Sequence, residues 1–325
     1  MKKIAVFTSG GDSPGMNACI RAIVRTAIFN NVEVVGIMQG YKGMIEGGEN
    51  YIPLTSRSVG NIIQRGGTIL KTSRSKEFMT VEGRKIAYEN LKENGIEGII
   101  CIGGNGTFTG AEIFYNEYQI PSIGAPGTID NDLYGTDLTI GFDTAINTAV
   151  NAIDKIRDTA DSHGRVFFVE VMGREAGFIA LASTIAGGAE IALLPEIKED
   201  YTEIISFFKG INNSKKSFTI AIVAEGNEEG GSMAIVEKVK KEIPDFDPRI
   251  VILGHIQRGG SPSAYDRVLA SRLGNGAVEA LLAGRKNEMV GLVNNQVVLT
   301  KYHDAIFCKK ELNPGLLKLI DIFNC

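Results

Sequence analysis

Two aspartates stand two positions apart in the segment 126–132, which reads PGTIDND. The segment follows the apolar run 123–125, a pattern typical of a strand ending at the rim of a sheet, where α/β proteins bind ligands. Residues two apart in extended backbone point to the same side, so Asp130 and Asp132 are expected to face one ligand. One carboxylate would act as a general base and the other would hold a metal or the proton partner of the first. Taken alone, the segment fits an Asx-rich surface turn equally well.

Two other strand-like runs end in glycine-rich turns, at 8–17 (TSGGDSPGMN) and at 102–107 (IGGNGT). Glycines permit positive φ and allow backbone N–H groups to close on a phosphate at a helix N-terminus. Neither turn matches G-x-G-x-x-G or the Walker A pattern, so neither a Rossmann nor a P-loop site is supported. Each turn alone is also explained as a tight connection, but two turns near the aspartate segment favour a phosphate site.

Arginines recur at turn-like positions, and several follow strand-like runs. Arg174 comes after the run 166–171, and Arg258 comes after the run 250–253 within the segment GHIQRGGSP. Arginine suits planar, bidentate capture of phosphate, although a single arginine is more often a solvated surface residue. Arg21 and Arg25 share a face of the first predicted helix, where either a separate anion site or a solvated face explains them.

The elements that must position these residues alternate between strands and helices. The strands are rich in Val and Ile, as parallel strands buried on both faces are. Helical periodicity marks a first helix at 16–27 and a long central helix at 146–156. This alternation predicts doubly wound α/β domains with largely parallel sheets. The predicted strands are 4–8, 32–38, 98–102, 122–125, 166–171, 191–194, 218–224, 250–253 and 289–293.

Composition excludes several classes of function. The chain has 325 residues and a net charge of −4, and without a polybasic block neither nucleic acid nor a membrane surface is an expected partner. No apolar run is long enough to span a membrane. The four cysteines are scattered without metal-ligand spacing, which predicts reduced thiols in a cytoplasmic protein. The three histidines do not cluster, so zinc is not expected.

Taken together, these motifs resemble the bacterial ATP-dependent 6-phosphofructokinases over essentially the whole chain. The matching segments, in order and spacing, are 8–12, 126–132, 172–174 and 254–262. The resemblance implies transfer of the γ-phosphoryl group of Mg-ATP to the 1-hydroxyl of fructose 6-phosphate, giving fructose 1,6-bisphosphate and ADP. It implies a phosphofructokinase-like fold with an ATP-binding α/β domain at 1–160, on which the C-terminal helices pack back, and a fructose-phosphate-binding α/β domain at 161–325. It also implies a homotetramer whose substrate sites are shared between subunits.

The resemblance assigns roles to individual residues. Asp130 resembles the catalytic base, Thr128 and Asp132 position substrate and metal, and Arg74 resembles the arginine that neutralises the transferring phosphoryl group. The ATP-binding residues would be Gly11, Arg74, Ser75, Gly104, Asn105, Gly106 and Thr107, with Mg²⁺ at Asn105 and Asp132. The fructose-phosphate residues would be Thr128, Ile129, Asp130, Met172, Gly173, Arg174, Glu225, His255, Ile256, Gln257 and Arg258, joined by Arg165 and Arg249 from a neighbouring subunit. Phosphoryl transfer depends mainly on positioning and charge stabilisation, which such groups provide.

One departure from the family pattern concerns the metal. The ATP-using family has aspartate where Asn105 stands, and asparagine keeps an oxygen ligand but loses a charge, which should weaken Mg²⁺ binding. Because Gly106 follows, deamidation of Asn105 to aspartate is a further hypothesis. Pyrophosphate-using relatives carry aspartate and lysine where Gly106 and Gly127 stand, so the resemblance favours ATP as the donor. The alternatives are a catalytically weakened sugar-phosphate-binding or regulatory paralogue and a pyrophosphate-dependent enzyme.

The other departure concerns regulation. In relatives, a nucleotide diphosphate or phosphoenolpyruvate binds between subunits at basic residues. The matching positions here are Arg21, Arg25, Arg157, Gly188, Glu190, Lys215 and Lys216. Ser56, Gly60 and Asn61 replace the usual arginine, serine and aspartate, with Arg57 as the neighbouring cation. The resemblance therefore predicts a weak or altered allosteric response.

Overall fold

The computed structural model describes residues 1–163, 165–198, 201–213, 218–228 and 230–323. The chain divides into two compact units. Unit 1 comprises residues 1–129, 133–144 and 258–310, and unit 2 comprises 130–132, 145–257 and 311–325. This division differs from the predicted boundary near 160, since the helix α5 (Phe142–His163) crosses it without a break in its periodicity. Of the C-terminal part of the chain, residues 258–310 belong to unit 1 and residues 311–325 to unit 2.

The sheet of unit 1 has the strand order β11-β10-β5-β4-β1-β2-β3. Its parallel part contains β1 (Lys3–Thr8), β2 (Glu33–Ile37), β4 (Gly98–Gly103), β5 (Ser122–Pro126) and β10 (Glu288–Val293). The edge strands β3 (Tyr51–Leu54) and β11 (Gln296–Lys301) run antiparallel. These two were absent from the predicted strands because short, half-exposed edge strands lack the continuous apolar run of buried strands.

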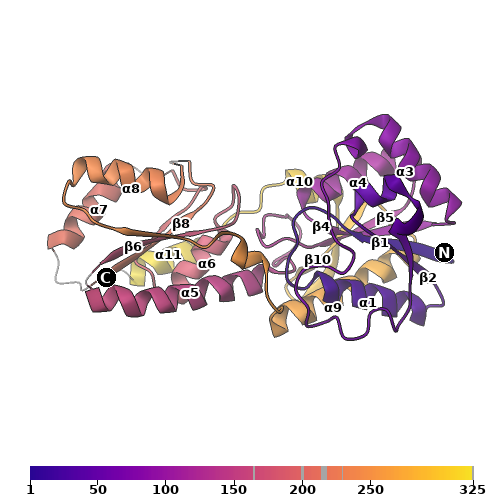
Figure 1. Cartoon of the computed structure of the whole chain (residues 1–325), viewed down its shortest axis with the longest axis horizontal. Helices are drawn as coiled ribbons and strands as arrows, with labels where there is room; N and C mark the ends of the chain where they lie inside the picture. The colour runs from indigo at the N-terminus through magenta and orange to yellow at the C-terminus, as the bar shows by residue number, and fades with distance from the viewer. Residues whose placement is uncertain (164, 199–200, 214–217, 229, 324–325) are drawn as a thin grey trace. The chain divides into compact units, whose positions relative to one another are not determined.

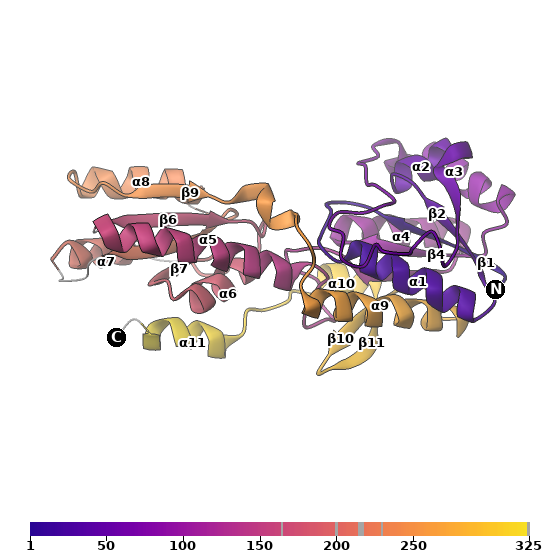
Figure 2. The same cartoon turned by 60° about the horizontal axis from the view of Figure 1, so that its bottom comes forward.

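Helices cover both faces of this sheet (Figures 1 and 2). Alternate residues of β1 enter opposite cores: Ile4 and Val6 pack with α1 (Met16–Phe29) and α9 (Ala264–Leu282), while Ala5 and Phe7 pack with the helices of the other face. That other face is covered by α2 (Tyr41–Glu46), α3 (Val81–Glu93), α4 (Asn105–Tyr118) and α10 (Tyr302–Phe307). The doubly wound arrangement predicted from the sequence is confirmed.

Unit 2 contains a parallel sheet in the order β7-β8-β6-β9. Phe168 and Phe208 lie in the core between this sheet and the helices α7 (Tyr201–Asn213) and α8 (Gly231–Glu242). The strands are β6 (Val166–Val171), β7 (Ile191–Leu193), β8 (Thr219–Ala224) and β9 (Arg249–Ile252). The helices wholly within the unit are α6 (Phe178–Gly187), α7 (Tyr201–Asn213), α8 (Gly231–Glu242) and α11 (Pro314–Phe323). None of the helices in the described ranges combines the length and the apolar character needed to cross a membrane.

Candidate functional site

The two glycine turns lie together at the carboxyl edge of the sheet in unit 1. β1 and β4 are neighbours, and the chain winds away from them in opposite directions, which makes this a topological switch point of the kind where α/β sheets bind ligands. The N–H of Ser9 donates to the carbonyl oxygen of Ile102 at 3.0 Å, and the Thr107 hydroxyl donates to the Ser9 carbonyl at 3.1 Å. These bonds fix the turn after β1 against the turn after β4.

Both turns lead into helices, but they differ in exposure: residues 13–17 at the start of α1 are buried, whereas Gly106 in the first turn of α4 is exposed. Gly15 precedes α1 with φ 113°, and Gly104 precedes α4, whose first residue is Asn105. Neither helix has a side-chain hydrogen bond from its N-cap residue, and glycine supplies no such acceptor. A phosphate at the start of α4 could accept hydrogen bonds from N–H groups there while benefiting from the helix dipole.

Two glycines near the turns of unit 1, Gly106 and Gly127, differ in the space they leave for a side chain. Gly106 is exposed, and a Cβ placed there would meet nothing within 4 Å. At Gly127, a Cβ would lie 2.8 Å from the side chain of Ile102 and 3.1 Å from that of Met16. The structure therefore has room for a side chain at Gly106 but none at Gly127.

The predicted ATP residues all belong to unit 1. Arg74 is exposed, and the Ser75 hydroxyl accepts a hydrogen bond from the N–H of Phe78 at 3.2 Å. Gly11 lies beside the Arg258 guanidinium, whose Nη1 donates to the Asp12 carbonyl at 3.3 Å. The structure thus brings Arg258, which the resemblance assigns to the sugar phosphate, beside the glycine turn of unit 1.

The aspartate segment links the two units along the chain. Thr128 and Ile129 are buried in unit 1, where the Thr128 carbonyl accepts a hydrogen bond from Thr139 at 2.6 Å. Asp130 and Asp132 are assigned to unit 2; Asp130 is 2% exposed and Asp132 is half-buried. The segment is therefore not the solvated surface turn that its composition alone permitted.

Asp130 is paired with Arg174 within unit 2. Nε of Arg174 lies 3.5 Å from Oδ2 of Asp130, and the arginine side chain is 58% exposed. A nearby guanidinium favours the ionised form of a carboxylate, and that form is the one a general base needs. The exposed part of the guanidinium remains accessible to an anionic ligand.

The turn that carries Arg174 is held by Glu225 and Gly226. Oε1 of Glu225 accepts hydrogen bonds from the N–H groups of Arg174 at 2.9 Å and Gly173 at 3.3 Å. A Cβ at Gly226 would lie 1.7 Å from the Arg174 carbonyl oxygen, so only glycine permits this approach. Arg174 itself has a positive φ of 53°. The sequence did not single out Gly226, because nothing local indicates that another backbone approaches it.

The remaining sugar-phosphate positions of unit 2 lie at two ends of its sheet. Buried Gln257 accepts a hydrogen bond from Met172 N–H at 3.4 Å, while His255 and Ile256 are exposed in the turn after β9. Arg165 precedes β6 and Arg249 begins β9, so both lie at the amino ends of the strands. Six residues of β6 separate the two edges, a span of about 20 Å. Within one chain, Arg165 and Arg249 therefore do not join Met172, Gly173 and Arg174.

Three of the predicted effector residues gather in unit 2. The Arg157 guanidinium donates to the carbonyl oxygens of Gly187 and Gly188, the latter at 2.6 Å, and Glu190 follows this turn. Arg21 and Arg25 lie on α1 of unit 1. Lys215 and Lys216 lie outside the described residues.

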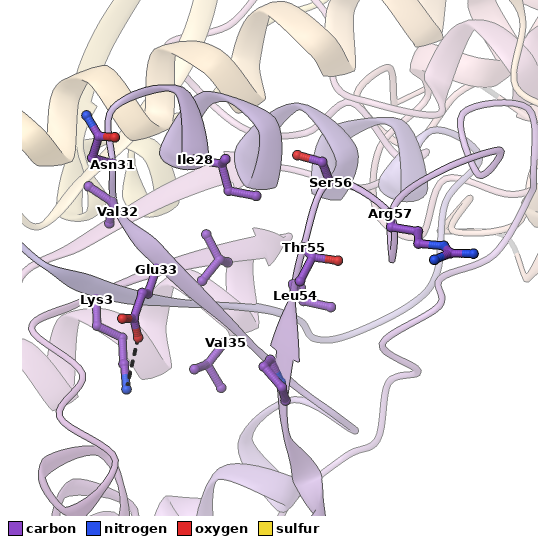
Figure 3. A pocket seen from close by; sticks show the side chains of 12 residues that line it. Lys3, Ile28, Asn31, Val32, Glu33, Val35, Leu54, Thr55, Ser56 and Arg57 are labelled. Atoms are coloured by element: carbon purple, nitrogen blue, oxygen red, sulfur yellow. Dashed lines mark ion pairs between the residues drawn. The ribbon is translucent and has the colours of Figure 1, made fainter.

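A separate cavity of about 770 Å³ lies beside β2 and β3 in unit 1 (Figure 3). The Lys3–Glu33 ion pair, Ile28 and Arg57 are among its lining groups. Ser56, which replaces the arginine usual in relatives, also lines it. None of the predicted catalytic or ATP residues does, so this cavity is distinct from the site at the glycine turns.

Few side chains of the described residues are placed to bind a metal ion. No cluster of three or more His, Cys, Asp or Glu residues that could hold a metal occurs in the described ranges. The predicted ligands Asn105 and Asp132 nevertheless supply an amide and a carboxylate oxygen, and Mg²⁺ is commonly held by one or two carboxylates together with substrate phosphates and water. Asn105 belongs to unit 1 and Asp132 to unit 2, and each has the oxygen chemistry that Mg²⁺ accepts beside the phosphates of a polyphosphate substrate.

Fold and site together define a doubly wound α/β protein that handles phosphate groups. The phosphofructokinase family model matches residues 3–281, and the chain belongs to the phosphofructokinase family. It is 58% identical to an ATP-dependent 6-phosphofructokinase of Cytophaga hutchinsonii over 324 residues, covering 100% of this chain and 98% of the relative. It is 54% identical to ATP-dependent 6-phosphofructokinase 1 of Thermus thermophilus, covering 99% of each.

Solved structures agree with the fold. The phosphofructokinase of Saccharomyces cerevisiae superposes with a TM-score of 0.89 at 33% identity, over 100% of this chain and 47% of that one. A pyrophosphate-dependent phosphofructokinase from Marinobacter aquaeolei superposes with a TM-score of 0.85 at 22% identity, covering 97% of this chain and 86% of that one. The second likeness concerns the fold alone. The predicted fold class and family are confirmed.

Proposed function

We propose that this protein is an ATP-dependent 6-phosphofructokinase of glycolysis, which transfers the γ-phosphoryl group of ATP to the 1-hydroxyl of fructose 6-phosphate. The full-length match at 58% identity to an ATP-dependent enzyme carries this conclusion. A coupled assay that measures ADP formation with fructose 6-phosphate tests it, and absence of turnover with ATP would overturn it. Pyrophosphate in place of ATP is the matched donor control.

Within this function, Asp130 is the base that accepts the proton of the sugar hydroxyl. The Arg174 guanidinium, 3.5 Å away, holds the carboxylate in place. Thr128 and Asp132 position the reacting groups, and Arg74 stabilises negative charge on the transferring phosphoryl group. The glycine turns of unit 1 bind ATP, and the strand ends of unit 2 bind the sugar phosphate.

Magnesium would be held by Asp132 and the Asn105 amide oxygen together with the phosphates of ATP. The ion supplies charge stabilisation as the phosphoryl group moves between oxygens. Because Asn105 contributes no charge, the chain relies on Asp132 and on ATP itself for metal binding. Asn105 is also the observation that favours a second candidate, a weakened sugar-phosphate-binding or regulatory paralogue. Binding of fructose 6-phosphate without turnover by either donor would support that candidate.

The nucleotide donor is supported by the two glycines. Gly106 leaves open space beside the first turn of α4, and a Cβ at Gly127 would contact the side chains of Ile102 and Met16. Neither position carries the aspartate or lysine of pyrophosphate-using relatives, which supports ATP as the donor. A pyrophosphate-dependent enzyme would be indicated by faster turnover with pyrophosphate in the same assay.

The position of Arg165 and Arg249 favours sites completed by a neighbouring subunit in a homotetramer. Both arginines lie at the edge of the unit 2 sheet opposite Arg174, so they are suited to serve another chain's site. Co-expression of D130N with R249A tests this arrangement. If each variant alone is inactive and assemblies containing both recover part of the activity, the sites are shared between subunits. If purified assemblies containing both variants recover no activity, the shared-site arrangement is contradicted.

Regulation by nucleotide diphosphate or phosphoenolpyruvate is proposed to be weak. Arg157 and Glu190 are retained, but Ser56 removes one cation from the expected anion site. Fewer cations mean weaker binding of a multiply charged effector. Titration of activity with ADP and phosphoenolpyruvate tests this proposal, and a strong sigmoidal response to either would contradict it.

A further inference from the structure

A lysine with a left-handed backbone conformation stands beside the first glycine turn. Lys71 has a φ of 57°, in the region that favours glycine and asparagine. Such a conformation is unfavourable for a residue with a side chain, and it persists only where surrounding contacts fix it. No local sequence pattern indicates this conformation, because lysine is not typical of left-handed positions.

Hydrogen bonds on both sides hold the Lys71 backbone in place. Asn17 Oδ1 accepts from Ile69 N–H at 2.7 Å, and the Leu70 carbonyl accepts from the backbone N–H of Gln39 at 2.8 Å. The Thr8 hydroxyl, at the end of β1, donates to the Lys71 carbonyl at 2.8 Å. The loop before Lys71 is thus tied to α1, to the end of β2 and to the end of β1.

The residue after Lys71 bonds directly to the glycine turn. The Thr72 hydroxyl donates to the Gly10 carbonyl oxygen at 2.7 Å. Lys71 is therefore adjacent in sequence to a residue in contact with the turn that we assign to ATP. A lysine ammonium lies about 6 Å from its Cα when extended, which is enough to reach an anion bound over that turn.

The side chain is exposed, and no ion pair to Lys71 occurs within 4 Å among the described residues. Neither burial nor an ion pair therefore accounts for a lysine at this left-handed position. A cation placed beside a phosphate-binding turn would account for it.

We propose that Lys71 binds the phosphate chain of the nucleotide, a role that rests on the proposed use of ATP. Its ammonium acts as a point charge on the polyphosphate in the bound ground state, which lowers the KM for ATP and strengthens ADP binding. Because the contact exists before the phosphoryl group moves, its loss should affect KM more than kcat.

Four variants test the proposal. K71M removes the charge but keeps a long side chain at the same φ, and we expect a five- to tenfold higher KM for ATP with kcat and the KM for fructose 6-phosphate within twofold. K71R keeps the charge and should stay close to the original enzyme. K92M, on α3, removes another exposed lysine of the same unit and should change nothing.

The glycine variant separates binding from structure. K71G relieves the backbone conformation, so its melting temperature should match or exceed that of the original chain, while its KM for ATP rises as in K71M. The difference between K71M and the original chain should also shrink in high salt. An unchanged KM for ATP in both K71M and K71G would overturn the proposal. Absence of ATP turnover in the unmodified chain would instead overturn the proposed function.

Discussion

Nε of Arg174 lies 3.5 Å from Oδ2 of Asp130, and the two side chains differ sharply in exposure. The carboxylate is 2% exposed, whereas more than half of the arginine side chain reaches solvent. A buried carboxylate needs a partner to stay ionised, and an exposed guanidinium can both stabilise it and meet an anionic substrate. The pair therefore couples the proposed base to the proposed sugar-phosphate site.

Replacement of the proposed base should abolish most turnover. We expect D130N to lower kcat by about 10²- to 10⁴-fold, since general-base catalysis contributes an effect of that size. The KM for ATP should change little, because the asparagine keeps the shape of the side chain. Steady-state kinetics measure both values. D245N, an exposed position of unit 2, is the matched control, and retention of kcat in D130N would exclude Asp130 as the base.

The turn that carries Arg174 should depend on Gly226. In G226A the new methyl group would meet the Arg174 carbonyl, so the turn must move and Arg174 with it. We expect kcat/KM for fructose 6-phosphate to fall at least tenfold, with the KM for ATP within twofold. E225Q is the milder comparison, because its side-chain oxygen can still accept from the same N–H groups. Equal kinetics for G226A and the original chain would contradict this role.

Magnesium dependence should change at Asn105. N105D restores a carboxylate, and we expect half-maximal activity at a several-fold lower Mg²⁺ concentration, because Mg²⁺ prefers charged oxygen ligands. N116D places the same charge near the other end of α4 and should leave the Mg²⁺ dependence unchanged. An identical Mg²⁺ titration for N105D and the original chain would argue against a metal at this position.

The state of Asn105 in the purified protein is a separate measurement. Peptide mapping by mass spectrometry distinguishes the amide from the aspartate that deamidation would produce. A peptide containing only the amide would exclude deamidation, and the Mg²⁺ titration would then report on asparagine alone.

Discrimination between donors should respond to Gly106. Because a side chain fits there, G106D should fold normally, and its carboxylate in the first turn of α4 should leave the melting temperature equal or higher. The same charge would repel the phosphates of ATP, so we expect the KM for ATP to rise about tenfold. G106A is the uncharged control and should bind ATP nearly as well as the original chain. An unchanged KM in G106D would place the phosphates elsewhere.

Stability should depend on a buried carboxylate at the start of α9. Asp266 accepts hydrogen bonds from Gly141 N–H and Thr144 N–H, each at 2.8 Å, and from the Thr144 hydroxyl at 2.5 Å. In D266N an amide N–H would face one of these donors, so we expect a loss of about 2–4 kcal/mol in the free energy of unfolding. Urea denaturation measures this loss, with N116D as an exposed control.

The same carboxylate should give stability a pH dependence. Burial raises the pKa of Asp266 to about 6, against the lowering effect of the Thr144 and Gly141 hydrogen bonds. The folded protein then holds more protons than the unfolded chain between about pH 4 and 6, so this contribution is largest at low pH and is lost as pH rises through 6. Between pH 5 and pH 7 the free energy of unfolding of the original chain should fall by about 1 kcal/mol more than that of D266N. If the free energy of unfolding depended on pH in the same way in both proteins, Asp266 would not be the source of the pH dependence.

The sequence by itself determined the parallel strands, the first helix and the two glycine turns. Buried parallel strands carry continuous apolar runs, and glycine turns are local in sequence, so both are visible without a fold. The family resemblance added the residue roles, among them Asp130 and Arg174. The sequence does not predict the edge strands β3 and β11, because their hydrophobic runs are short and their residues are partly exposed.

Only the tertiary structure decided which distant residues meet. The pairing of β1 with β4 brings residues almost a hundred positions apart, Ser9 and Thr107, into hydrogen-bonding contact. The return of the chain to unit 1 at α9 places the buried Asp266 carboxylate where it accepts a hydrogen bond from Thr144 at the start of α5. The left-handed backbone of Lys71 and the close approach to Gly226 depend on long-range hydrogen bonds and contacts. Such contacts leave no local pattern, because the free energy that fixes them comes from packing between segments far apart in the chain.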